Sequence, residues 1–104
     1  RYHIGLFQIA NEPGFLIPTL YNYVNQQNKT AKIVRYILKN RYKTTRDGIP
    51  GNDDSGSMSA WYIFHSLGFY PNAGQDVYLI SSPIFKETII HLENGKALKI
   101  VTSY

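Results

Sequence analysis

The chain of 104 residues contains no cysteine, and only seven of its residues are acidic. The absence of cysteine excludes disulfide bonds and thiolate metal sites, and it leaves the redox compartment open. No apolar run reaches about eighteen residues, so we expect no membrane span. There is no Walker loop, no G-x-S-x-G motif and no histidine pair at metal-binding spacing. These absences argue against a nucleotide site, a serine hydrolase and a zinc site.

Basic residues outnumber the acidic ones, which gives a net charge of +4 and a pI near 9.4. Many of them lie within residues 29–46, a concentration that would suit a nucleic-acid-binding surface. Lys32, Arg35 and Lys39, however, share one face of an expected helix whose other face is apolar. This pattern is typical of a solvated helix face. We therefore expect no nucleic-acid partner.

The apolar pattern divides the chain into a helical part, residues 1–71, and a β part, residues 72–104, of the same domain. In the first part apolar residues recur three and four positions apart, as in helices that pack on one side. Asn28 or Thr30 would cap the second of these helices, and Gly68 would end the third. The expected helices lie at about residues 18–25, 30–42 and 57–67.

The β part alternates apolar and polar residues, and strands are expected at residues 77–81, 88–93 and 96–102. Asn94-Gly95 between the last two predicts a two-residue hairpin turn. A hairpin of this length is not stable alone, so we expect it to dock on the helices or on other strands. The chain also begins without methionine, on an apolar stretch. We therefore expect it to be a segment of a longer polypeptide.

Asp53 and Asp54 stand side by side in a glycine-rich loop, GNDDSG (51–56), directly before the third expected helix. An aspartate here can cap the helix, because free N–H groups and the helix dipole attract negative charge. Alternatively, one of the two does chemistry. Adjacent carboxylates cannot flank one glycosidic bond, so at most one of them would belong to an acid–base pair. The spacing alone leaves both interpretations open.

Two other features have a functional and a structural interpretation. Asn11 and Glu12 offer amide and carboxylate oxygens that suit calcium, but an ordinary polar turn before a helix has the same composition. Trp61, two helical turns beyond Asp54, could stack on a sugar, although core packing explains it as well. The buried helix face would equally accommodate His65 as a core residue.

Three linked motifs resemble glycoside hydrolase family 92, a family of calcium-dependent, exo-acting α-mannosidases. The resemblance covers nearly the whole chain in order. It consists of NEPGFLIPTLYNY (11–23), DGIPGNDD (47–54) and GNDDSGSMSAWYIFHSLGFYP (51–71), followed by YLISSPIF (78–85).

The resemblance implies an α+β fragment: the last helices of an (α/α)6 toroid followed by a short antiparallel β-segment. An N-terminal β-sandwich and the other toroid helices would be partners within the same longer chain. The implied reaction removes terminal α-linked mannose, α-1,2-linked in particular, from a glycan substrate. It proceeds by inversion and requires Ca²⁺ as cofactor. An extracellular or periplasmic location accompanies that function.

The resemblance also implies residue roles. By motif position the catalytic residues are Asp54, as general base, and its neighbour Asp53; the substrate-binding residues are Asn52 and Trp61; the metal ligands are Asn11 and Glu12. The family's general acid lies upstream, so the isolated chain is expected to be inactive.

The chain departs from the family pattern at two places. Asn52 is an amide where some members carry an acid, and residues 14–16 replace a common histidine pair. The alternative function is therefore a non-catalytic carbohydrate-binding or scaffold fragment.

Overall fold

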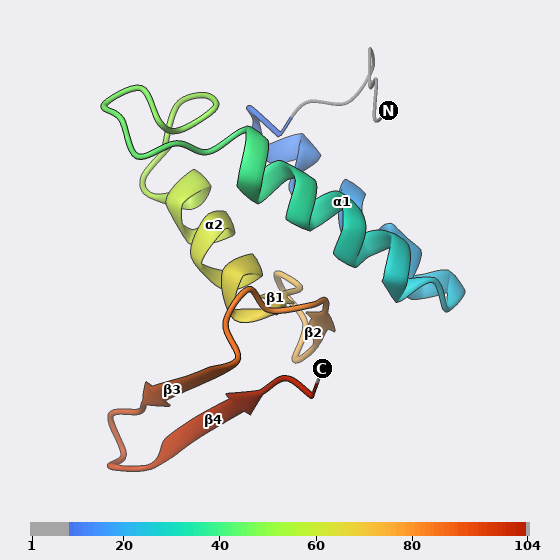
Figure 1. Ribbon diagram of the computed structural model, residues 1–104, viewed down its shortest axis with the longest axis vertical. Coiled ribbons are helices and arrows are strands. Elements are labelled where there is room, and N and C mark those ends of the chain that lie inside the picture. The colour runs from blue at the N-terminus through green and yellow to red at the C-terminus, as the bar shows by residue number, and fades with distance from the viewer. Residues whose placement is uncertain (1–8, 104) are drawn as a thin grey trace.

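The computed structural model describes residues 9–103, and the apolar opening of the sequence and Tyr104 lie outside this range. Helices come first and strands follow, which confirms the predicted α+β class (Figure 1). The elements are the 3₁₀ helices η1 (Glu12–Gly14) and η2 (Ile17–Val24), the α-helices α1 (Gln27–Asn40) and α2 (Ser57–Leu67), and the strands β1 (Phe69–Pro71), β2 (Tyr78–Ile80), β3 (Glu87–His91) and β4 (Ala97–Val101).

The first expected helix forms as the 3₁₀ helix η2 and not as an α-helix. Pro18 has no N–H to donate and stands in its first turn. The Thr19 hydroxyl donates to the Leu16 carbonyl at 2.7 Å, which tightens that turn. The helix ends at Val24, and the φ of its C-cap residue Asn25, 56°, lies in the left-handed region. The expected boundaries of this segment are thus within one residue of the observed ones, although its helix type differs.

Helix α1 runs from Gln27 to Asn40, so it begins and ends earlier than predicted. Neither Asn28 nor Thr30 caps it. The Thr30 hydroxyl instead donates to the Pro18 carbonyl at 2.9 Å, and Thr30 is fully buried there. A side chain expected to start the helix therefore ties α1 to η2.

The core forms where α2 packs against α1 and against residues 11–23, the segment that begins with Asn-Glu-Pro and is called the NEP segment below. Met58 and Trp61 of α2 are fully buried, together with Val34 and Ile37 of α1. The Trp61 indole N–H donates to the Phe15 carbonyl at 3.0 Å. An unpaired indole N–H in this core would cost free energy, so the hydrogen bond to Phe15 holds the Trp61 ring at one depth in the core.

His65 is buried in the same core, as the sequence analysis expected. Its ring stacks on Tyr70 with 4.8 Å between centroids, and the Trp61 ring lies 4.2 Å away. Neither ring nitrogen has a hydrogen-bond partner among the residues that the structure describes. Burial disfavours the charged imidazolium and lowers the pKa of His65 to about 3.

This pKa shift predicts that acid destabilises the fold through His65. The unfolded chain takes up the proton near the ordinary pKa of 6.5, whereas the folded ring stays neutral down to about pH 3. The unfolded state therefore binds more protons, and the free energy of unfolding falls as the pH drops from 6.5 towards 3. His65→Phe keeps an aromatic ring but removes the titration. Denaturant unfolding at about pH 7 and pH 4.5 should show a weaker acid dependence in this variant. An equal dependence would contradict the assignment.

The first sheet contains a strand that was not predicted. Gly68 ends α2 with a φ of 96°, and β1 then pairs antiparallel with β2, with Phe69 opposite Ile80. The strand β1 contains only residues 69–71, so no alternating pattern could mark it. The predicted strand at residues 77–81 is confirmed as β2.

Strands β3 and β4 form the predicted hairpin, with Glu87 opposite Val101 and His91 opposite Ala97. The predicted two-residue turn is wrong. The Gly95 N–H donates to the Leu92 carbonyl at 3.1 Å, and of residues 93–95 only Gly95 has a positive φ, 78°. This is the longer loop in which a left-handed glycine follows a turn.

The hairpin lies beyond the C-terminal end of α2 and does not extend the first sheet (Figure 1). An apolar groove of about 890 Å³ separates it from α2 and β2, with Ile63, Ile80, Leu98 and Ile100 in its lining. The hairpin thus faces the helices across a groove that the described residues do not fill, and the expected docking on the helices or on other strands stays a prediction. None of the described helices is long and apolar enough to cross a membrane.

Candidate active site

The long loop between α1 and α2 folds back onto the NEP segment. Its first half is closed by two hydrogen bonds, from the Lys43 N–H to the Gly48 carbonyl and from the Gly48 N–H to the Thr45 carbonyl, both 2.9 Å. Gly51 then approaches Ala10 so closely that a Cβ on Gly51 would lie 2.3 Å from the Ala10 carbonyl oxygen. Only glycine permits this approach, and it brings two motifs distant in sequence together.

Asp53 caps helix α2 from outside the N-cap position, which Gly56 occupies. Its carboxylate accepts a hydrogen bond from the Ser59 N–H at 2.9 Å. Its carbonyl oxygen accepts from the Met58 N–H at 3.3 Å and from the Ser57 hydroxyl at 3.1 Å. The structural interpretation of the aspartate pair, a helix cap, therefore describes Asp53.

The next residues turn the chain in the left-handed sense. Asp54, Ser55 and Gly56 have φ values of 44°, 59° and 89°. For L-residues this region costs about 1–2 kcal/mol each, less for aspartate, so the surrounding contacts must hold the turn in place. The turn separates the two aspartates in space: Asp53 faces the helix, and Asp54 faces the NEP segment.

The carboxyl groups of Asp54 and Glu12 are in hydrogen-bond contact. That contact, burial and the charges of Glu12 and Asp53 raise the pKa of Asp54 above its usual 3.8. The pKa of Glu12 is lowered, first by a backbone hydrogen bond and then by the Asp54 side chain. Of the two carboxyl groups, Asp54 is therefore the weaker acid and Glu12 the stronger. Both side chains are exposed to solvent.

Asn11 supports Glu12 from the preceding position. The Asn11 side-chain oxygen accepts from the Glu12 N–H at 3.2 Å and caps η1, whose end is closed by the Phe15 N–H to the Glu12 carbonyl at 3.0 Å. The carboxylate of Glu12 is thus held at the start of a short, tightly bonded turn.

The candidate calcium ligands provide only part of a calcium site. Calcium takes six to eight oxygen ligands. Glu12 and Asp54 can offer carboxylate oxygens, and Asn11 an amide oxygen that already accepts one hydrogen bond. Within residues 9–103 no group of three or more acidic or histidine side chains is placed to hold a metal. The donor chemistry fits calcium, but further ligands would have to come from elsewhere.

The remaining candidate residues have different surroundings. Asn52 is exposed in the same loop as Asp54. Trp61 is 0% exposed, so a sugar cannot stack on its ring here, and core packing is its role in this structure. The sequence analysis named Glu12 and Asp54 separately but missed their contact. The signal that could have indicated it is Gly51, whose lack of a side chain permits the approach to Ala10.

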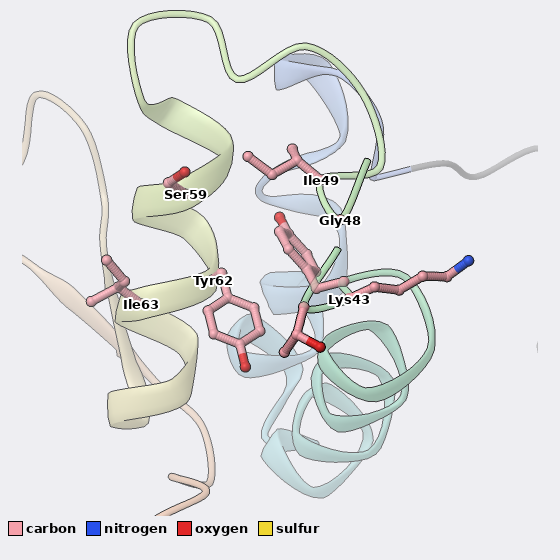
Figure 2. A pocket seen from close by; sticks show the side chains of 8 residues that line it. Lys43, Gly48, Ile49, Ser59, Tyr62 and Ile63 are labelled. Carbon is pink, nitrogen blue, oxygen red and sulfur yellow. The ribbon is translucent and has the colours of Figure 1, made fainter. Parts of the chain in front are cut away.

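A separate pocket of about 340 Å³ lies between α2 and the long loop (Figure 2). Ser59, Tyr62 and Ile63 come from α2, Ile49 comes from the loop, and the Lys43 amine points away (Figure 2). No acidic side chain is among the described residues that line it. The described lining of this pocket is mainly apolar and contains no carboxylate, so the candidate site remains the pair of carboxyl groups of Glu12 and Asp54.

Comparison with known proteins shows the family of the chain. Residues 1–104 match the family model described as the glycosyl hydrolase family 92 catalytic domain. The chain belongs to glycoside hydrolase family 92. A relative from Arthroderma benhamiae, described as an uncharacterized secreted glycosidase, is 38% identical over 97 residues. The match covers 92% of the family 92 chain and 13% of that relative.

Solved structures of family 92 enzymes have the same fold over this segment. A GH92 α-mannosidase from Bacteroides thetaiotaomicron aligns with a TM-score of 0.85 at 40% identity, covering 92% of this chain and 13% of that one. Its complex with mannoimidazole gives 0.81 at 41%, covering 86% and 12%. A GH92 inverting mannosidase from the same organism gives 0.77 at 37%, also covering 86% and 12%. The family 92 chain therefore spans about an eighth of the length of these enzymes.

Proposed function

We propose that this family 92 chain forms one side of the active site of an α-mannosidase that removes terminal α-linked mannose with inversion. The observation that carries the proposal is the exposed contact between Glu12 and Asp54, built by two motifs distant in sequence. The α-mannosidases among its relatives, one of them inverting, supply the reaction class. The helices would belong to an (α/α)6 toroid completed by the rest of the polypeptide.

In this proposal Asp54 is the general base. During inversion a water molecule attacks the anomeric carbon, and a carboxylate on that face accepts its proton. A pKa raised towards the working pH makes Asp54 a stronger base than an ordinary aspartate. Asp54 must be ionised to accept that proton.

We place the general acid outside this chain, as the family resemblance implies. Inverting enzymes keep the two carboxyl groups about 6.5–9.5 Å apart, to leave room for the water and the sugar. Glu12 is in hydrogen-bond contact with Asp54, and Asp53 is its sequence neighbour, so neither can protonate the leaving oxygen. The isolated 104-residue chain should therefore release no mannose.

The proposal includes Ca²⁺ bound by Glu12 and Asn11. Bound calcium would hold sugar hydroxyls and favour the flattened ring of the transition state. The lowered pKa of Glu12 favours the ionised carboxylate, which is the form that binds a cation. Asn52, exposed in the same loop, would contact the sugar. We further propose α-1,2 specificity and, from the secreted relative, an extracellular or periplasmic location.

The alternative is a scaffold or carbohydrate-binding segment in which the loop only caps a helix. That interpretation explains Asp53, whose carboxylate bonds to α2. It leaves unexplained why Asp54 faces Glu12 at the surface with a raised pKa. We therefore favour the catalytic interpretation for Asp54 alone.

The direct test is hydrolysis of α-1,2-mannobiose by the full-length protein. We expect mannose to be released first as the β-anomer, seen by proton NMR of the early reaction mixture, because inversion changes the configuration. Chelation with EDTA should abolish turnover, and added Ca²⁺ should restore it. The isolated chain is the negative control, and α-1,3- and α-1,6-mannobiose test the linkage. Release of the α-anomer, or full activity in EDTA, would contradict the mechanism.

A further inference from the structure

We propose that Asp53 is a positioning residue that holds Asp54 at the active site by capping helix α2, and that Asp53 itself takes no part in the chemistry. The inference rests on the proposed function, because it assigns Asp54 its task. It also separates two adjacent carboxylates that sequence alone cannot tell apart.

The side-chain and main-chain oxygens of Asp53 are hydrogen-bonded to the first turn of α2. Its carboxylate accepts from the Ser59 N–H at 2.9 Å, and its carbonyl accepts from Ser57 and Met58. Asp53 is half-buried, whereas Asp54 is exposed and its carboxyl contacts Glu12. The carboxylate of Asp53 is therefore occupied by the helix, while that of Asp54 faces outwards.

The start of α2 needs this cap, because its own N-cap position is a glycine. Gly56 has no side chain that could accept from the first helical N–H groups, and no cap bond arises there. The acceptor comes instead from Asp53, on the far side of the left-handed turn. The Asp53 side chain thus satisfies one of the free N–H groups at the helix terminus and holds the end of the turn that carries Asp54.

The position of Asp54 follows from this arrangement. Asp54 and Ser55 occupy a backbone region that L-residues seldom adopt, so the turn persists only while both of its ends are held. Gly51 against Ala10 holds one side, and Asp53 on α2 holds the other. Without the cap the loop can relax, and Asp54 would leave its place beside Glu12.

The experiment compares Asp53→Ala with Asp53→Asn in the full-length protein. Asparagine keeps a side-chain oxygen that can accept from the Ser59 N–H, whereas alanine does not. We expect Asp53→Ala to lower kcat for α-1,2-mannobiose by up to about 100-fold with little change in KM, since small misplacements of a reacting group cost this much. Asp53→Asn should restore most of kcat. Asp76→Ala makes the same change at an exposed loop and is the matched control.

A second measurement does not depend on activity. Hydrogen–deuterium exchange of the peptide that spans the start of α2 should rise in Asp53→Ala and stay near the wild-type level in Asp53→Asn, because only alanine removes the cap. Equal protection in all three proteins would overturn the inference. So would an Asp53→Asn variant that keeps the protection but loses kcat as fully as the alanine variant, since the carboxylate itself would then be needed. A wild-type protein without mannosidase activity would refute the proposed function, while the exchange comparison would still decide whether Asp53 holds the turn.

Discussion

Asp54→Asn in the full-length protein is expected to lower kcat for α-mannoside hydrolysis by about 10²–10⁴-fold, the usual contribution of general base catalysis. The amide has the size of the carboxyl group but cannot accept the proton of the attacking water. Asparagine also tolerates the left-handed φ of 44° at this position, and its N–H can still donate to the Glu12 carboxylate. The variant should therefore fold as the wild type does.

Steady-state kinetics on α-1,2-mannobiose, together with thermal melting followed by circular dichroism, checks this expectation. Asp76→Asn makes the same chemical change at an exposed loop position and should leave both kcat and the melting temperature near the wild-type values. An Asp54→Asn enzyme with wild-type kcat would remove Asp54 from the mechanism. A variant that loses activity and also unfolds would indicate a structural role instead.

Trp61→Ala is expected to lower the free energy of unfolding by about 3–5 kcal/mol, as truncation of a buried aromatic side chain does. The ring is fully buried against Met58 and the apolar face of α1, and the Phe15 carbonyl would lose the indole N–H that donates to it at 3.0 Å. Denaturant unfolding monitored by circular dichroism measures the loss.

Trp61→Phe separates the two contributions. It keeps a ring in the stack with Tyr42, whose plane lies within 3° of the indole at 6.0 Å, but it removes the hydrogen bond to Phe15. A smaller loss than that of alanine is expected. If Trp61→Ala instead left stability unchanged and raised KM for the mannoside, the sugar-stacking role considered from the sequence would be correct.

The sequence predicts those elements whose apolar residues repeat over several turns. Helix α2 was placed at residues 57–67 because its apolar residues and Gly68 mark both its length and its end. Strand β1 was missed since three residues cannot show a period. The caps expected for α1 were wrong because Thr30 donates its hydroxyl to Pro18 in another element, and only the packed structure determines that choice.

The site was predictable as a set of residues but not as an arrangement. The motifs indicated Asp53, Asp54 and Glu12 individually. The left-handed turn at residues 54–56 determines which aspartate caps the helix. The sequence of these three residues does not by itself predict such a turn. The contact of Asp54 with Glu12 depends on Gly51 reaching Ala10 across the fold, which local propensities do not encode.

The left-handed turn affects which substitutions this segment can accept during evolution, because it separates Asp53 from Asp54. In the proposed mechanism Asp53 serves stability and Asp54 serves turnover, so selection would act on the two positions through different properties. A lineage that gave up hydrolysis could replace Asp54 with a residue that tolerates its left-handed φ, such as asparagine, while retaining an acceptor at Asp53 to keep α2 intact. With the proposed roles, a single substitution at Asp54 would remove catalysis and leave the architecture unchanged, so an inactive descendant would lie one mutational step away.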